Sequence, residues 1–221
     1  MSDQLNAREK REVSGFTSLA FNGMGKIDLI QGDHEELEIV AQAEIRSRIR
    51  TEVRDGTLYI DYEEDWKDWS GIRRLSGDKI TFNLMMREIT SIAIAGVGNL
   101  DTPRIETPAL SLALSGPGLL TIGTLKTTTV SIALNGVGVV DVAGTTDEMN
   151  LSISGAGSVK AARLEAGKVD VKLSGVGNAT LWAKNQLDTA VSGAGYIEYY
   201  GKPLVNQRNS GLGVLKFMGN R

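Results

Sequence analysis

A short phrase ending in Gly-x-Gly recurs at a nearly constant interval between Ile89 and Gly213, and this interval restricts the fold more than any other feature. The first glycines of its copies lie 20, 20, 19, 20, 18 and 18 residues apart. A fixed period in this range is typical of architectures in which equivalent segments stack on one another. The first glycines are Gly96, Gly116, Gly136, Gly155, Gly175, Gly193 and Gly211.

Apolar residues alternate with polar ones on both sides of each glycine phrase. They stand two and four residues before the first glycine, as Leu114 and Leu112 do, and four and six residues after it, as Leu120 and Ile122 do. Each unit is therefore predicted to be two short strands with one face of each pointing to a common interior. The glycines are expected to supply corner dihedrals that a Cβ would obstruct.

A repeat of about 20 residues cannot bury its apolar face alone, so neighbouring repeats must stack on it. The predicted fold is all-β, a single-stranded parallel β-helix, or β-solenoid, with Gly-x-Gly repeats and an inserted N-terminal β-hairpin. The hairpin is indicated by Asp55-Gly56, a strong two-residue turn signal between alternating segments.

The chain is predicted to be one domain behind a short tail. Residues 1–12 are rich in charge, lack apolar periodicity and are expected to be a flexible tail, whereas residues 13–221 form a single β-solenoid domain. Within that domain, residues 13–88 hold a first rung and the hairpin insertion. Residues 89–221 hold the regular repeat array and a C-terminal cap.

The cap is predicted from a decay of the repeat at its C-terminal end. Gln207 and Asn209 occupy positions that are apolar in earlier copies. Polar residues there suit a terminal rung that shields the last edge from pairing with another chain.

Composition excludes several classes of function. The net charge is −3 with both signs dispersed, so there is no basic footprint for nucleic acid and no polybasic surface for anionic lipid. The chain has no cysteine, which excludes disulfides, zinc ribbons and thiol nucleophiles. No segment approaches the apolar length that spans a bilayer, so membrane insertion is not expected.

The motifs of catalysis and cofactor binding are also missing. The Gly-x-Gly phrases lack the third glycine of the dinucleotide fingerprint, and Asp101 and Asp141 are too isolated for a calcium-binding repeat. His34 is the only histidine, and no Gly-x-Ser-x-Gly elbow occurs. We therefore predict no catalytic residue, no cofactor and no metal site.

One acidic segment, residues 63–71, interrupts the repeats and carries two of the three tryptophans. Flat aromatic faces beside carboxylates can stack on sugars or anchor a protein partner. The alternative is that the tryptophans cover one end of the solenoid, since burial is the commoner use of this side chain. The candidate partner-binding residues are Glu64, Asp65, Trp66, Asp68 and Trp69.

The repeated Ser-Gly-Ala-Gly type phrase and the closing segment Ser192 to Pro203, which ends in Tyr-x-Gly-x-Pro, resemble the putative auto-transporter adhesin, head GIN domain family. The resemblance covers about residues 13–221. It implies a bacterial β-solenoid of unassigned biochemical activity, without a catalytic motif. It also implies an extracytoplasmic location, in the periplasm or at the cell surface, with the cytoplasm as the alternative if Met1 is the native start.

We therefore predict a noncatalytic structural or adhesion-type module that presents a repetitive surface to a protein, a glycan or another copy of itself. The partners expected are a protein or glycan at the cell surface, and a homo-oligomer is compatible with the flat flanks of a solenoid. The alternative is a polysaccharide-active enzyme that uses acidic residues on the solenoid flank or in the 61–68 loop.

Overall fold

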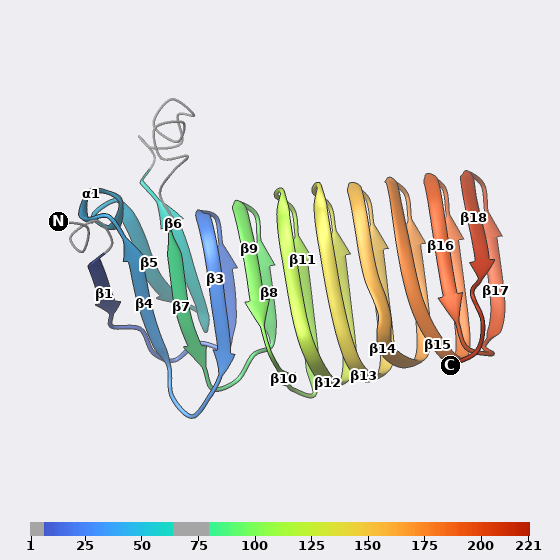
Figure 1. Cartoon of the computed structure of the whole chain (residues 1–221), viewed down its shortest axis with the longest axis horizontal. Coiled ribbons are helices and arrows are strands. Elements are labelled where there is room, and N and C mark those ends of the chain that lie inside the picture. Colours follow the sequence, from blue (N-terminus) through green and yellow to red (C-terminus); the bar gives the residue numbers. More distant parts are fainter. Residues whose placement is uncertain (1–6, 64–79) are drawn as a thin grey trace.

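The computed structural model describes residues 7–63 and 80–221 and has the all-β architecture that the repeats predict. Figure 1 shows the strands stacked along one axis into a β-solenoid, with β18 at the far end. The strands of the repeat array are β8 (Ser91–Ile94), β9 (Val97–Thr102), β10 (Ile105–Glu106), β11 (Ala109–Leu114), β12 (Gly118–Leu134), β13 (Gly138–Ile153), β14 (Ala156–Leu173), β15 (Val176–Val191), β16 (Ala194–Tyr200), β17 (Leu204–Asn209) and β18 (Leu212–Phe217).

The coil has two parallel faces, and the long strands β12 to β15 contribute to both. The first half of β12 pairs with the first half of β13 through Leu120 and Val140, and the second halves pair through Ile132 and Leu151. Equivalent positions of successive repeats thus lie above one another, as the alternation predicts. Since every second side chain points inward, the interior is a set of aliphatic ladders with almost no exposure to solvent.

The corner glycines are required by the stacking of the rungs and not by unusual dihedrals. A Cβ on Gly116 would overlap the carbonyl oxygen of Gly96, and a Cβ on Gly175 would overlap that of Gly155. None of the first glycines from Gly96 to Gly211 has a positive φ. The explanation from corner dihedrals is therefore wrong. The glycines are needed because backbones of neighbouring rungs approach here more closely than a side chain permits.

The first repeat stacks directly on the array, although 59 residues of chain separate their strands in the sequence, from 32 to 90. Strand β2 (Ser18–Phe21) pairs with β8, and β3 (Met24–Gln31) pairs with β9, both in parallel. The intervening segment folds outward onto the other side of this repeat. Its elements are β4 (Glu36–Ala41), α1 (Ala43–Arg46), β5 (Ile49–Arg54), β6 (Thr57–Tyr62) and β7 (Thr81–Met86).

The predicted hairpin is confirmed, and one of its strands also extends the solenoid. Strands β5 and β6 are antiparallel around Asp55 and Gly56, whose φ angles of 48° and 71° suit a tight hairpin turn. Strand β6 also pairs in parallel with β2, and β7 pairs in parallel with β3. The insertion therefore supplies one further rung, packed through a T-shaped contact of Phe21 and Phe82 with ring centroids 5.2 Å apart.

Part of the predicted tail is ordered as a strand. Strand β1 (Ala7–Arg11) pairs antiparallel with β4, which itself pairs antiparallel with β7. The expectation of a flexible tail is therefore wrong for residues 7–11. An edge strand rich in charge is a common way to end a sheet without inviting another chain, which explains why the segment lacks an apolar pattern.

At the other end, β17 and β18 pair with β15 and β16, and no described strand pairs with their outer edges. The side chain of Asn209 accepts a hydrogen bond from the N–H of Gly211 at 3.1 Å and donates one to the carbonyl of Gly213 at 2.7 Å. This amide organises the last corner from a position that holds an apolar residue in earlier rungs.

Replacing a corner glycine by alanine should destabilise the fold, because the new Cβ would overlap the backbone of the rung below. We expect Gly175→Ala to lower the free energy of unfolding by about 1–3 kcal/mol, as overpacking does, measured by urea denaturation. Val176→Ala, at a side chain that is 65% exposed, is the matched control and should change it by less than about 0.5 kcal/mol. Equal midpoints for Gly175→Ala and the unmodified protein would contradict the close approach.

Candidate ligand-binding groove

A groove of about 660 Å³ runs along the solenoid axis and crosses the strands from β10 to β15. Strand β10 lies at the lower edge of the solenoid in Figure 1, whereas the Gly-x-Gly corners lie at the upper edge. The groove therefore belongs to the second bend of each coil, where the chain returns from one parallel face to the other.

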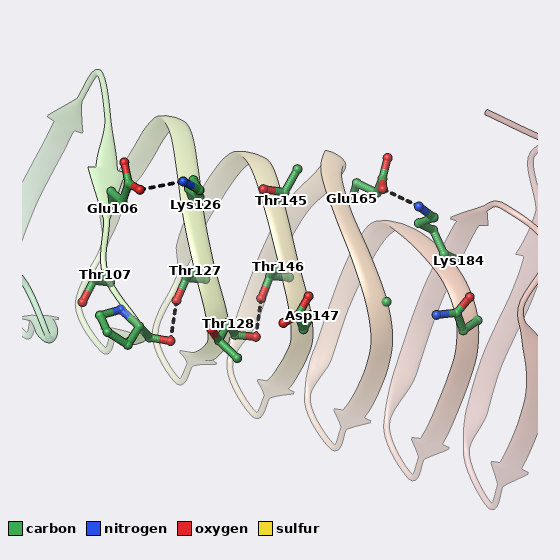
Figure 2. Close-up of a pocket in the computed structure, with 13 residues that line it drawn as sticks. Glu106, Thr107, Lys126, Thr127, Thr128, Thr145, Thr146, Asp147, Glu165 and Lys184 are labelled. Carbon is green, nitrogen blue, oxygen red and sulfur yellow. Dashed lines mark hydrogen bonds and ion pairs between the residues drawn. The ribbon is translucent and has the colours of Figure 1, made fainter.

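Strand register arranges the lining residues in rows along the axis (Figure 2). The first row consists of Glu106, Lys126, Thr145 and Glu165, each paired with the next. The second row lies two residues further along the chain and consists of Pro108, Thr128, Asp147 and Gly167, and Asn185 of β15 continues it beside Gly167. Because residues two apart share one face of a strand, both rows point into the groove.

Ion pairs hold most charges of the first row. The Lys126 ammonium lies 2.7 Å from one carboxylate oxygen of Glu106, and the Arg104 guanidinium lies 2.6 Å from the other. Hydrogen bonds from Lys126 and then from Arg104 hold the pKa of Glu106 below its ordinary value. A third pair joins Lys184 to Glu165 at 2.7 Å. The pairs of Lys126 with Glu106 and of Lys184 with Glu165 link neighbouring rungs, so the row strengthens the stack while it lines the groove.

Buried threonines between the two rows shape the bend. The hydroxyl of Thr127 lies 3.1 Å from the carbonyl oxygens of Pro108 and Thr129. The hydroxyl of Thr146 donates at 2.9 Å to Glu148 and lies 3.1 Å from the carbonyl of Thr128. These side chains therefore satisfy backbone acceptors at the corner, and they are not available to a ligand.

The floor of the groove offers polar groups that are free. Within residues 7–63 and 80–221, the side chains of Thr128, Asp147 and Asn185 have no hydrogen-bond or ion-pair partner. Gly167 lies between Asp147 and Asn185 on the intervening rung, and a Cβ there would come within 2.8 Å of the Asp147 carbonyl and 3.7 Å of the Asn185 amide nitrogen. The glycine thus leaves a space between the backbone of Asp147 and the side-chain amide of Asn185.

A second hollow of about 580 Å³ continues the groove toward the N-terminal rungs and shares Glu106, Thr107 and Pro108 with it. The side chain of Gln31 closes one wall of this hollow by making the two hydrogen bonds that a backbone residue of a neighbouring strand would make. Its amide nitrogen donates to the carbonyl of Glu106 at 3.0 Å, and its oxygen accepts from the N–H of Glu106 at 2.8 Å. The side chain thereby joins the end of β3 to β10.

The partner-binding residues predicted from the sequence, Glu64, Asp65, Trp66, Asp68 and Trp69, lie outside the described residues and stay a prediction. Two acidic residues of the same region are described, and both have partners. Asp61 accepts a hydrogen bond from Asn22 at 2.7 Å, and Glu63 lies 3.4 Å from Arg50. Within the described residues, no group of three or more His, Asp or Glu side chains is arranged to hold a metal ion.

The groove was not predicted from the sequence, although a signal for it exists there. Thr107, Thr127 and Thr146 recur at the repeat period, each followed within two residues by a polar residue or proline. The glycine repeat marks one bend of the coil, whereas the groove lies at the other bend.

Comparison with known proteins gives a family and a fold. A sequence model of the family described as putative auto-transporter adhesin, head GIN domain, matches residues 15–203. A search of curated proteins found no match.

Solved structures of three bacterial proteins share the fold. A putative adhesin from Bacteroides fragilis NCTC 9343 has a TM-score of 0.84 at 24% identity, covering 98% of this chain and 97% of that one. A putative adhesin from Parabacteroides merdae ATCC 43184 has a TM-score of 0.72 at 19% identity, covering 97% and 96%. A putative lipid binding protein from Parabacteroides distasonis ATCC 8503 has a TM-score of 0.72 at 17% identity, covering 97% of each chain.

Removing a buried corner hydroxyl should weaken the bend that forms the groove. We expect Thr146→Val to cost about 0.5–1.5 kcal/mol of unfolding free energy, the net contribution of one buried hydrogen bond. Thr145→Val, at the exposed neighbouring position, should change stability by less than about 0.5 kcal/mol. Urea denaturation of both variants measures the difference. Equal losses would show that the hydroxyl of Thr146 has no structural role.

The ion pairs of the groove predict a titration behaviour with a definite sign. Because Lys126 favours the charged form of Glu106, the stability from this contact is present at neutral pH and disappears as the pH falls through the lowered pKa. In Lys126→Met, we expect the pKa of Glu106 to rise toward its ordinary value, measured by NMR titration of the carboxyl carbon. In Lys184→Met, a lysine that pairs with Glu165 instead, the pKa of Glu106 should not change. An unchanged pKa in Lys126→Met would argue against the ion pair in solution.

Proposed function

The chain belongs to the family of putative auto-transporter adhesins with a head GIN domain, and on this premise we propose that it is a noncatalytic adhesion-type module that binds a glycan chain along the axial groove. The observation that carries the proposal is the set of free polar side chains, Thr128, Asp147 and Asn185, that line the groove, the last two on either side of Gly167. The groove crosses five successive rungs, so it offers about 20 Å of length at the usual strand spacing.

The chemistry of the lining favours a sugar polymer. A hydroxyl group donates and accepts hydrogen bonds, so a chain of hydroxyls can satisfy carboxylates, an amide, threonines and ammonium groups in one continuous site. Glu106, Asp147 and Glu165 face Lys126 and Lys184 among the lining residues, so the lining is nearly neutral and has no excess of positive charge for a polyanion. These features favour a neutral or weakly charged glycan over nucleic acid.

A peptide ligand fits the groove less well. Extended peptides gain most of their affinity by adding a strand to a free sheet edge. Strands β12, β13 and β14 already pair with neighbours on both sides, so the groove offers side chains and few free backbone groups. A ligand that uses its own hydroxyls does not need such an edge.

The charge states of the acidic residues support binding without catalysis. A glycosidase needs one carboxyl whose pKa is raised, so that it can donate a proton to the leaving oxygen. The pKa of Glu106 is lowered instead, and Glu165 is held in an ion pair by Lys184. The alternative of a polysaccharide-active enzyme therefore has no observation in its favour among the groove residues.

We further propose that the module acts outside the cytoplasm, in the periplasm or at the cell surface, as the family description implies. Within the described part of the chain, no helix is both long enough and apolar enough to cross a membrane.

The experiment is a glycan-binding measurement with matched variants. The protein would be screened against an array of bacterial and plant polysaccharides, and the best ligand titrated by calorimetry. We expect Asp147→Ala combined with Asn185→Ala to weaken binding at least about tenfold, which is 1.4 kcal/mol. The control is Asn150→Ala combined with Asp170→Ala, which removes the same two chemical groups from paired positions outside the groove.

Three outcomes of this experiment would contradict the proposal or part of it. Equal affinities for the groove variant and the control variant, with both folded, would exclude the groove as the site. Binding of no glycan on the array would contradict a glycan ligand. Release of shortened sugars during incubation would contradict the noncatalytic function and would favour the polysaccharide-active enzyme.

A further inference from the structure

The middle residue of the Gly-x-Gly phrase is apolar in every copy of the array, and it points out of the solenoid. We call this line of side chains the ridge. It consists of Val97, Pro117, Val137, Ala156, Val176 and Ala194, and it ends at Leu212. Val137, Val176 and Leu212 expose 64%, 65% and 84% of their surface. The stacking of the repeats does not require apolar residues here, because these side chains contribute nothing to the interior.

The ridge is continuous along the axis. Ala156 pairs with Val176, Val176 with Ala194, and Ala194 with Leu212 in the parallel ladders. From Val97 to Leu212 it crosses six rung spacings, a length of about 29 Å at the usual strand spacing of about 4.8 Å.

A shallow trough of about 730 Å³ runs beside the C-terminal half of the ridge. Its floor is the row of second glycines, among them Gly157 and Gly177, and its far wall includes Val139, Tyr196 and Val214. Tyr196 and Val214 expose 57% and 47% of their surface. The described residues that line the trough include Ser158 and Asn178 but no charged side chain. An exposed, uncharged and mostly apolar surface of this kind is typical of an interaction site.

We propose that the ridge and trough form a docking surface for a second copy of this chain, which binds antiparallel about a twofold axis. This inference does not rest on the glycan proposal, because the groove and the ridge share no residue. In the complex, the ridges of the two copies lie along each other, and the trough beside each ridge widens the contact.

Two properties of the surface select a second copy as the occupant. The first is charge: each copy has a net charge of −3, and this uncharged strip lets two of them meet without bringing like charges together. The second is period. The side chains of the ridge repeat at the rung spacing, so a partner that engages all of them must have the same spacing. A second copy of this chain has the same spacing because its rungs are identical.

Side-chain size along the ridge fixes the register. Small and larger residues alternate as Val137, Ala156, Val176 and Ala194. A twofold axis between Ala156 and Val176 places Val137 opposite Ala194 of the second copy, and Ala156 opposite its Val176. Val137 and Val176 then each face an alanine, the arrangement in which two apolar surfaces interdigitate.

The size of the surface predicts a weak dimer. In this register the two ridges overlap from Pro117 to Leu212, a length of about 24 Å. Three residue positions across the strands give a width of about 10 Å, so the strip covers roughly 240 Å² on each copy, or about 500 Å² in total. Stable complexes bury about 1,200 Å² or more, and smaller interfaces belong to transient contacts. The dimer is therefore reversible and concentration-dependent.

Analytical ultracentrifugation up to millimolar concentration tests the docking surface. The unmodified protein should pass from monomer to dimer as its concentration rises. Val137→Asp combined with Val176→Asp should weaken the dissociation constant at least about tenfold, whereas Ser131→Asp combined with Ser152→Asp, on exposed positions of the other face, should not. Val137→Thr combined with Val176→Thr keeps the side-chain shape and tests the same surface if the aspartates impair folding.

Three results would overturn the proposal. One is an unmodified protein that stays monomeric throughout the range. Another is a ridge variant that dimerises as the control does. The third is a monomer that floats with phosphatidylcholine vesicles and loses this property in the ridge variant, because the ridge would then face lipid.

Cysteine crosslinking tests the register, since the chain has no cysteine of its own. Val137→Cys mixed with Ala194→Cys should form disulfide-linked dimers at least about tenfold faster than either variant alone, because only the mixture places the two thiols opposite each other. Faster crosslinking of Val137→Cys alone would overturn the antiparallel arrangement. Equal rates in all samples would overturn the specific register.

Discussion

The whole structure depends on how closely successive rungs can stack at the Gly-x-Gly corner. Carbonyl oxygens of one rung occupy the volume that a Cβ of the next rung would need, as Gly96 and Gly116 illustrate. Once glycine removes this obstacle, the parallel ladders run from β8 to β18, with register shifts where the long strands pass from one face to the other. Aliphatic residues such as Leu120 and Val140 come to lie directly above one another. Hydrophobic burial then stabilises a coil that no single repeat could form.

The same stacking places equivalent residues of successive rungs in lines along the solenoid axis. Inward positions become apolar ladders, and outward positions become surfaces whose chemistry repeats along the axis. At one bend this produces the polar groove with its free Asp147 and Asn185. At the other it produces the apolar ridge from Val97 to Leu212. A solenoid can therefore present two different surfaces at opposite edges, each long and narrow, which suits extended ligands and lateral contacts better than a small substrate.

The array was predictable because its signal is local and redundant, with the glycine period and the alternation agreeing in each copy before the C-terminal one. The N-terminal region was less predictable. Asp55-Gly56 identified the hairpin, but the pairing of β6 with β2 and of β7 with β3 joins segments that no short-range pattern relates. Strand β1 was mistaken for a tail because an edge strand needs no apolar face. The groove was not predicted because exposed polar residues line it, and the alternation of apolar residues identifies only the interior positions.

The sequence alone determined the class of fold, the phase of each rung and the identity of the interior residues, because all three follow from periodicity within about 20 residues. Only the tertiary structure decided why the corners are glycine, where the inserted segment packs and which outward side chains share a surface. Those questions concern distances between rungs. The distance from Gly155 to Gly175, or from Asp147 to Asn185, is set by stacking and has no counterpart along the chain.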